Sequence, residues 1–239
     1  GHLVSDTEVQ DYSGTEKRGT MIEFVPDNSH GLFENYHFRD EFIETMMRNY
    51  AYLNTGLSLV YNGKRYTSKN GLFDLLTDNM TVDPLYPIIH LKGEDIEIAL
   101  THTNQSGEEY HSFVNGQHTI QGGTHQVAFR EAIARTIKEF FNKNQEYSDI
   151  RNGVVGAIAI NVSEPVFESQ TKVKLGSKDM SPEGGLSVNK FVGDFIKQQL
   201  DNYLHKNQNT VEVMLQKIQE SEKERKAIAG VTKAARERA

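Results

Sequence analysis

Apolar residues repeat along this chain with two periods, one typical of helices and one typical of strands. Positions spaced three or four residues apart predict helices at 42–53, 71–80, 124–141 and 188–204. Runs rich in β-branched and aromatic residues predict strands at 57–61, 65–67, 88–91, 96–103, 110–114 and 154–162. Two further β-prone runs, at 7–12 and 20–25, predict a hairpin at the start of the chain. Turn residues separate the three runs between 88 and 114, so an antiparallel meander is expected there. Asn62-Gly63 predicts a tight hairpin turn, since both of its central residues need positive φ.

Together these elements predict the α+β class, with a two-layer sandwich of a mostly antiparallel sheet, helices packed on one face, and a charged C-terminal helix. The run 154–162 is apolar and rich in β-branched residues, which indicates a strand buried on both faces. The first helix carries an apolar stripe that is interpreted as core packing, because Met and aromatic residues at helical spacing usually fill a core. Its members are Phe42, Ile43, Met46, Met47, Tyr50 and Leu53. The last helix starts near Asn209 and is charged on all sides, so it either bridges domains or frays when alone.

Composition narrows the class of protein. With 239 residues and 37% hydrophobic content, the chain can bury the core of one large or two modest domains. A formal net charge of −7 argues against a surface that coats nucleic acid as a whole, so any DNA contact must be a local patch. The absence of cysteine excludes disulfides and fits a cytoplasmic protein. No run reaches the roughly 20 apolar residues of a membrane span, so no membrane partner is expected.

The polar residues give little support to a metal site or to a self-contained hydrolase. Four histidines lie in different predicted elements, without a cysteine partner or a His-Glu-x-x-His motif: His102, His111, His118 and His125. No Gly-x-Ser-x-Gly elbow, P-loop or dinucleotide fingerprint occurs. The sequence therefore predicts no metal ligand.

Candidate phosphate-binding residues follow the buried strand. Gln170, Thr171 and Lys172 lie on a loop that this strand holds in place, and proteins commonly present polar groups to a ligand in this way. The Gln amide and the Lys ammonium offer N–H donors and a positive charge, which suit phosphate oxygens. A plain solvated loop is the commoner explanation of such a tripeptide, so residue chemistry by itself leaves phosphate binding as the weaker alternative.

This loop resembles a known family. The run from Ser169 to Leu175, which follows Pro165 and contains Gln-Thr-Lys, is similar to the ATP-sensing loop in the transducer domain of the B subunits of bacterial type II topoisomerases. In that family the Gln and the Lys reach the γ-phosphate of ATP that a neighbouring ATPase domain holds. The resemblance implies that Gln170 and Lys172 bind the nucleotide and that Lys172 is catalytic.

A second motif supports the resemblance. Gly122-Gly123-Thr124-His125, with Thr124 as the expected N-cap, is similar to the start of the family's long transducer helix. The Arg that follows the aromatic residue of that helix faces the DNA cavity, which implies a DNA-facing role for Arg130; a solvated charged face is the alternative. Gln121 and the run 110–115 favour the topoisomerase IV branch, and the gyrase branch stays as the alternative.

The resemblance also implies a domain plan and a set of partners. Residues 1–27 are expected to be a terminal hairpin of a preceding ATPase domain, residues 28–206 the transducer domain, and residues 207–239 a helix leading to a Toprim domain. The family's magnesium-binding helix, Asp-x-Gly-x-Gly motif and glycine lid do not occur in the sequence, so the ATP pocket is expected outside this chain. The full-length isomerase would use ATP and Mg²⁺, act on DNA with a topoisomerase A subunit, and form a B-subunit homodimer. This chain by itself is expected to be monomeric and inactive and to bind no cofactor.

A different class of function is a plain nucleic-acid-binding module with the same type of fold. Such a module predicts a concentrated basic face with interleaved aromatic residues. The acidic balance of the chain disfavours it.

Overall fold

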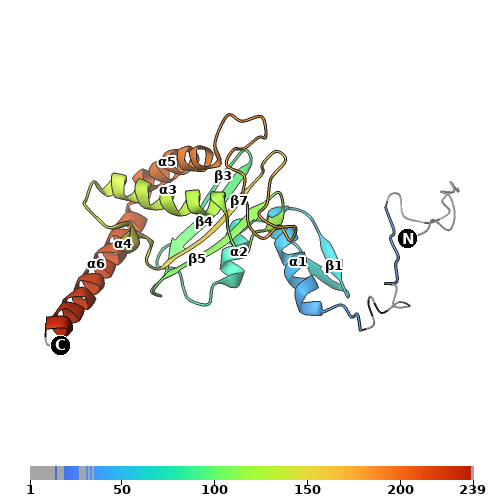
Figure 1. The fold of residues 1–239 in the computed structure, drawn as a ribbon, viewed down its shortest axis with the longest axis horizontal. Coiled ribbons are helices and arrows are strands. Elements are labelled where there is room, and N and C mark those ends of the chain that lie inside the picture. Colours follow the sequence, from blue (N-terminus) through green and yellow to red (C-terminus); the bar gives the residue numbers. More distant parts are fainter. Residues whose placement is uncertain (1–13, 15–18, 27–30, 32, 34, 238–239) are drawn as a thin grey trace. The chain divides into compact units, whose positions relative to one another are not determined.

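A computed structural model describes residues 14, 19–26, 31, 33 and 35–237 (Figure 1). The chain divides into two compact units, residues 1–40 and residues 41–239. In the first unit, residues 19–26 have no regular backbone structure, so the strand expected at 20–25 is not formed. A strand is stabilised by hydrogen bonds to a neighbouring strand, and the expected neighbour at 7–12 lies outside the described residues.

Five strands form one sheet, with β7 (Val154–Ile160) at its centre. On one side β7 pairs antiparallel with β4 (Ile96–His102), and on the other it pairs parallel with β5 (Glu108–Val114). The edge strands are β3 (Ile89–Gly93) beside β4 and β6 (Gln117–His118) beside β5, both antiparallel. The expected meander is wrong, because β7 separates β4 from β5. The apolar side chains of β7 are buried on both faces, as a central strand requires.

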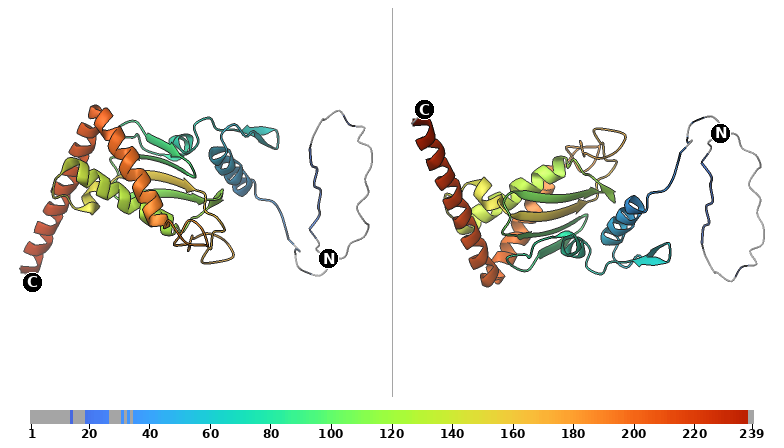
Figure 2. Two further views of the ribbon diagram at one scale, coloured as in Figure 1. Left: turned by 90° about the horizontal axis from the view of Figure 1, so that it is seen from above. Right: turned by 90° about the horizontal axis from the view of Figure 1, so that it is seen from below.

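Helices cover both faces of this sheet (Figure 2). Helices α3 (Thr124–Phe141) and α5 (Val188–Lys206) pack against the face that holds Ile98. The shorter α2 (Leu72–Asn79) packs against the opposite face, which holds Ala99. Successive strand residues point to opposite faces, so β4 supplies both cores. The predicted α+β sandwich with a mostly antiparallel sheet is confirmed, and α2 is an addition to the helices expected on one face.

Helix α1 (Asp40–Leu53) leads into a two-stranded hairpin of β1 (Leu59–Tyr61) and β2 (Lys64–Tyr66). Asn62 and Gly63 connect the two strands with φ angles of 48° and 79°. These positive values confirm the turn that the dipeptide predicted.

The apolar stripe of α1 is only partly buried, which corrects the prediction that it fills a core. Ile43, Met47 and Leu53 are partly buried, and the other three members are exposed. Phe42, Met46 and Tyr50 are 59%, 52% and 42% exposed. Ala51 and Tyr52 are the buried residues of this helix, and Tyr52 joins the core around α2. The helix therefore packs through its C-terminal end, where the stripe residue Leu53 contacts the same core. Helical spacing alone does not say which apolar positions of a helix find a partner.

Helix α6 (Gln208–Glu237) begins in the core and continues along polar contacts. Met214 and Ile218 are fully buried, whereas Ser221 accepts a 2.9 Å hydrogen bond from the Asn152 amide. Asn152 directly follows the short helix α4 (Tyr147–Arg151). Among the described residues, none of the helices combines the length and the apolar character needed to cross a membrane.

Candidate functional site

The predicted phosphate-binding residues lie at the tip of a small hairpin in the loop between β7 and α5. Phe167 and Leu175 form an antiparallel bridge that closes this hairpin. Inside it, the Glu168 amide donates to the Lys174 carbonyl at 3.0 Å. The Lys172 amide donates to the Ser169 carbonyl at 3.0 Å and so forms the tight turn at the tip. The backbone of the loop is thus fixed by its own hydrogen bonds.

The side chains at the tip differ in whether they have protein partners. Gln170 and Lys172 are exposed, and within residues 35–237 no hydrogen bond or ion pair engages the Gln170 amide or the Lys172 ammonium. Lys174 instead forms a 3.0 Å ion pair with Glu168. Lys172 has a φ of 56°, in the left-handed region that non-glycine residues seldom adopt. The turn therefore presents one amide and one ammonium for an external ligand.

The two sequence motifs meet directly in the structure. The Leu175 amide donates to the Gly122 carbonyl at 3.0 Å, and the Thr124 amide donates back to the Leu175 carbonyl at 3.2 Å. The Gln121 amide adds a 2.9 Å bond to the carbonyl of Val173. The start of α3 and the Gln-Thr-Lys loop consequently form one backbone unit. Sequence reasoning missed Val173 and Leu175, which carry no polar side chain that could have signalled their role.

Thr124 does not cap α3 as predicted. Gly123 occupies the N-cap position, and no side chain caps this end of the helix. The Thr124 hydroxyl donates at 2.7 Å to the carbonyl of Ser177, 53 residues further along the chain. The hydroxyl thus ties α3 to the far side of the loop, because a nearby carbonyl offers it a tertiary partner.

A groove of about 670 Å³ lies between the start of α3 and this loop. Its polar lining includes both amide and cationic side chains, namely Gln121, Gln126, Arg130, Lys174, Lys178 and Asn189. Glu168 is the carboxylate in the lining, and it is paired with Lys174. The groove therefore suits an anionic group better than a cation.

Arg130 projects from α3 toward the sheet and has a partner that the sequence did not reveal. Its Nε and Nη2 atoms donate to the two carboxylate oxygens of Glu108 at 2.9 and 2.7 Å. The guanidinium also lies 5.7 Å from the ring centroid of Tyr110. Hydrogen bonding to Glu108 raises the pKa of Arg130. Arg130 is thus a fixed cation at the surface, with 38% of its side chain exposed.

The buried histidines hold the fold together. His102 is fully buried, and its Nε2 donates to the Ile150 carbonyl at 2.7 Å while its Nδ1 accepts from the Tyr86 hydroxyl at 2.6 Å. Burial lowers the pKa of His102 to about 4, and that of His125 likewise to about 4. Within the described part of the chain, no three His, Asp or Glu side chains are grouped to hold a metal ion.

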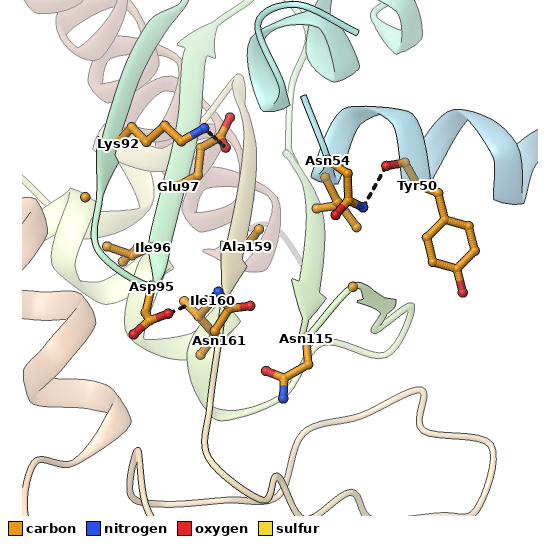
Figure 3. Close-up of a pocket in the computed structure, with 13 residues that line it drawn as sticks. Tyr50, Asn54, Lys92, Asp95, Ile96, Glu97, Asn115, Ala159, Ile160 and Asn161 are labelled. Carbon is orange, nitrogen blue, oxygen red and sulfur yellow. Dashed lines mark hydrogen bonds and ion pairs between the residues drawn. The ribbon is translucent and has the colours of Figure 1, made fainter. Parts of the chain in front are cut away.

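A second pocket lies between the end of α1 and the edge of the sheet (Figure 3). Its charged groups are already paired, since Lys92 lies 3.4 Å from Glu97 and the Asn161 amide donates to Asp95 at 3.1 Å. Asn54 in turn donates to the Tyr50 carbonyl at 2.9 Å. The polar groups of this pocket satisfy one another, so it is a weaker candidate than the groove beside α3.

Comparison with known sequences gives one family and many relatives. A sequence profile described as DNA gyrase B matches residues 42–234. The B subunit of DNA topoisomerase 4 from Borreliella burgdorferi is 37% identical over 240 residues, which cover 100% of this chain and 38% of that protein. The B subunit of DNA gyrase from Helicobacter pylori is 31% identical over 247 residues, which cover 95% of this chain and 31% of that protein. The chain thus spans well under half the length of these relatives.

Two solved structures share the fold. The 43K ATPase domain of Thermus thermophilus gyrase B, in complex with an aminocoumarin, has a TM-score of 0.68 at 24% identity and covers 84% of this chain and 58% of that one. The topoisomerase IV ATP-binding domain of Francisella tularensis has a TM-score of 0.63 at 21% identity and covers 80% of this chain and 55% of that one.

Proposed function

The chain belongs to the DNA gyrase B family, and on that premise we propose that it is the transducer part of a topoisomerase IV B subunit. In this function it couples γ-phosphate sensing and ATP hydrolysis to movement of a DNA clamp and to strand passage. Identity of 37% to the B subunit of a topoisomerase 4, against 31% to that of a gyrase, supports this assignment over the gyrase alternative. The full-length protein is then an ATP-hydrolysing isomerase of the cytoplasm.

The Gln-Thr-Lys turn is the observation that carries the proposal. Gln170 and Lys172 point outward from a backbone that is fixed on both sides, and within residues 35–237 their polar ends have no protein partner. Both groups supply N–H donors and Lys172 adds a positive charge, so together they fit phosphate oxygens better than a cation such as Mg²⁺. The groups that hold Mg²⁺ and adenine would belong to the preceding ATPase domain.

Bound ATP with Mg²⁺ supplies the phosphoanhydride bond that is hydrolysed. Lys172 would place its ammonium against the γ-phosphate and stabilise the negative charge that redistributes during hydrolysis. Gln170 would donate to a second oxygen and fix the orientation of the group. Because the turn is bonded to the start of α3, loss of these contacts would release the loop and α3 as one body.

The remaining partners follow from the same family premise. Arg130 would face a DNA duplex, and the protein would act as a B-subunit homodimer together with topoisomerase A subunits. Residues 1–27 would end the ATPase domain, residues 28–206 would form the transducer domain, and residues 207–239 would lead to the Toprim domain.

Reconstitution tests this function. The full-length protein that contains this chain, combined with its topoisomerase A subunit, is expected to decatenate linked circular DNA in an ATP-dependent manner and to introduce no negative supercoils. Negative supercoiling of relaxed DNA would instead identify a gyrase. An absence of any ATP-dependent change in DNA topology, with both proteins folded, would contradict the proposal.

A further inference from the structure

Glu108, at the start of β5, lies between two arginines from different helices. Arg130 of α3 donates to both of its carboxylate oxygens, at 2.9 and 2.7 Å. Arg151 of α4 donates to the same carboxylate through its Nε at 3.3 Å. The Tyr110 hydroxyl completes the set with a 2.8 Å bond. One carboxylate thus binds two guanidinium groups whose residues are 21 positions apart in the sequence (151 − 130).

The cluster carries a net positive charge and is open to solvent. Its two guanidiniums and one carboxylate sum to one positive charge. Burial raises the pKa of Glu108, but hydrogen bonds from Arg130 and Tyr110 outweigh that effect and hold the pKa below its ordinary value of 4.5. The side chains of Arg130, Glu108 and Arg151 are 38%, 23% and 18% exposed. The carboxylate is therefore charged at neutral pH and can be reached from outside.

We infer that Arg130 and Arg151 together form a binding site for a phosphate group of the DNA backbone, and that Glu108 fills this site while DNA is absent. A carboxylate and a phosphate offer a guanidinium similar paired oxygens, so the group that holds the two arginines in position is a chemical substitute for the ligand. The inference rests on the proposed DNA-facing role of Arg130. It adds a second arginine to that role and a competitor that weakens binding.

The resident carboxylate selects for a polyanion. Replacement of Glu108 by one free phosphate ion exchanges one pair of charge-assisted bonds for another and leaves an unpaired carboxylate beside the bound anion. A duplex offers many phosphates, and neutralising each of them releases condensed counterions, so the same exchange becomes favourable only as part of a longer contact. Glu108 would accordingly keep the affinity low, as suits a duplex that must pass through and leave.

Substitution of Glu108 has a matched control in the next residue. Glu109 carries the same charge, but its carboxylate pairs with His111 at 3.0 Å, and adjacent strand residues point to opposite faces. Glu108→Gln removes the competitor while its amide oxygen can still accept from Tyr110. Glu109→Gln removes one charge from the chain without touching the arginine pair.

The experiment uses the full-length protein and measures its binding to a duplex oligonucleotide by fluorescence anisotropy over a series of salt concentrations. Glu108→Gln is expected to tighten binding at low salt and to steepen the plot of log K against log salt by about 0.9, because one more positive charge faces phosphate. Arg151→Gln is expected to weaken binding and flatten the plot as Arg130→Gln does. Arg65→Gln, on the β1–β2 hairpin, serves as the charge-matched control and should have little effect.

Thermal melts identify variants that fail to fold. Arg151→Lys is a milder change that keeps the charge, and its affinity for DNA should lie between those of the wild type and Arg151→Gln. Equal effects of Glu108→Gln and Glu109→Gln would overturn the inference, because only overall charge would then matter. Displacement of DNA by inorganic phosphate, at an ionic strength matched with chloride, would also overturn it in favour of a small-anion site. If Arg130→Gln left DNA binding unchanged, the DNA-facing role of Arg130 would itself be wrong. If Arg130→Gln weakened DNA binding but the Glu108 and Arg151 variants left it unchanged, that role would stand and the shared phosphate site would be wrong.

Discussion

Gly123 and Leu175 are joined as a parallel bridge, and the contact leaves no room for a side chain at position 123. A Cβ atom built on Gly123 would lie 2.5 Å from the Leu175 amide nitrogen and closer still to its carbonyl oxygen. The φ angle of Gly123 is 135°, which L-residues with a side chain rarely adopt. The glycine is therefore required where the start of α3 meets the nucleotide-sensing loop.

Substitution of this glycine should detach the loop. Gly123→Ala is expected to lower the free energy of unfolding by about 1–3 kcal/mol, through backbone strain and lost hydrogen bonds. Chemical denaturation measures the loss, and hydrogen exchange should show faster exchange of the Leu175 amide. The control is Gly193→Ala in α5, where the new Cβ has no atom within 4 Å apart from the neighbouring helix backbone. Helix propensity should there raise the free energy of unfolding by about 0.5–1 kcal/mol. A fully stable Gly123→Ala protein with a protected Leu175 amide would contradict the packing argument.

Lys172 should matter for hydrolysis more than for ATP binding. In the full-length protein, Lys172→Ala is expected to lower kcat for ATP by about 10² to 10³, because one charge that stabilises the transition state is lost. ATP affinity should change little, since adenine and Mg²⁺ would be held elsewhere. Lys172→Arg should restore activity only in part, because the guanidinium is a wide fork and the ammonium a compact charge.

The control for this substitution is two residues away. Lys174→Ala removes the same charge, but Lys174 is paired with Glu168 at 3.0 Å and should leave most ATPase activity intact. Steady-state rates and nucleotide titrations measure both parameters. A wild-type rate for Lys172→Ala would mean that the turn does not sense the γ-phosphate.

Arg130→Gln should uncouple DNA from hydrolysis. Arg130 is proposed to face DNA, and its hydrogen bonds go to Glu108 and not to the Gln-Thr-Lys tip. Its loss is therefore expected to reduce DNA-stimulated ATPase activity more than basal activity. In a plot of the logarithm of the apparent DNA affinity against the logarithm of the salt concentration, the slope should also be smaller by about one unit. Equal reduction of basal and stimulated rates would indicate a structural role in the pair with Glu108.

Stability should fall as the pH is lowered from about 6.5 toward 4. His102 has an ordinary pKa of 6.5 when unfolded and about 4 when folded, so between these values only the unfolded chain binds the proton. Protonation then favours unfolding, at up to about 1.4 kcal/mol per pH unit for each such histidine. Above the unfolded pKa neither state is protonated, and this effect vanishes.

Denaturant titrations at several pH values test this assignment. In His102→Gln, the free energy of unfolding should depend less steeply on pH, by the equivalent of about one bound proton. This expectation holds whatever the substitution does to stability near neutral pH. The exposed His205, whose side chain is 65% exposed, is the control, and His205→Gln should leave the slope nearly unchanged. If the slope is the same in the wild type and in His102→Gln, the buried imidazole is not the source.

The ion pair between Asp149 of α4 and Arg225 of α6 is expected to stabilise the packing of these two helices. Arg225 donates to both oxygens of the buried Asp149 carboxylate, each at 2.8 Å. Arg225→Gln should lower Tm, because it leaves a buried charge without its partner. Asp149→Asn together with Arg225→Gln should lower Tm by less than the two single changes combined, which a double-mutant cycle of melting experiments measures. Strict additivity would show that the two groups do not interact.

The sequence by itself determined the local structure and the chemistry of this protein. Apolar periodicity predicted the helices α1, α2, α3 and α5 but not α4. Asn62-Gly63 predicted the hairpin turn, and the composition of residues 154–162 predicted a strand buried on both faces. The Gln-Thr-Lys motif identified the family, which the profile match over residues 42–234 confirms. These features can be read because each depends on residues within a few positions of one another.

Tertiary structure decided which distant residues meet. Only the strand order places β7 between β4 and β5, and that order brings Glu108 to Arg130 and Leu175 to Gly123. It also decided that Tyr52 of α1 is buried whereas Met46 is exposed. Period and propensity specify which faces are apolar, but not which apolar face or which charge finds a partner. That choice depends on how the whole chain packs, so no local pattern records it.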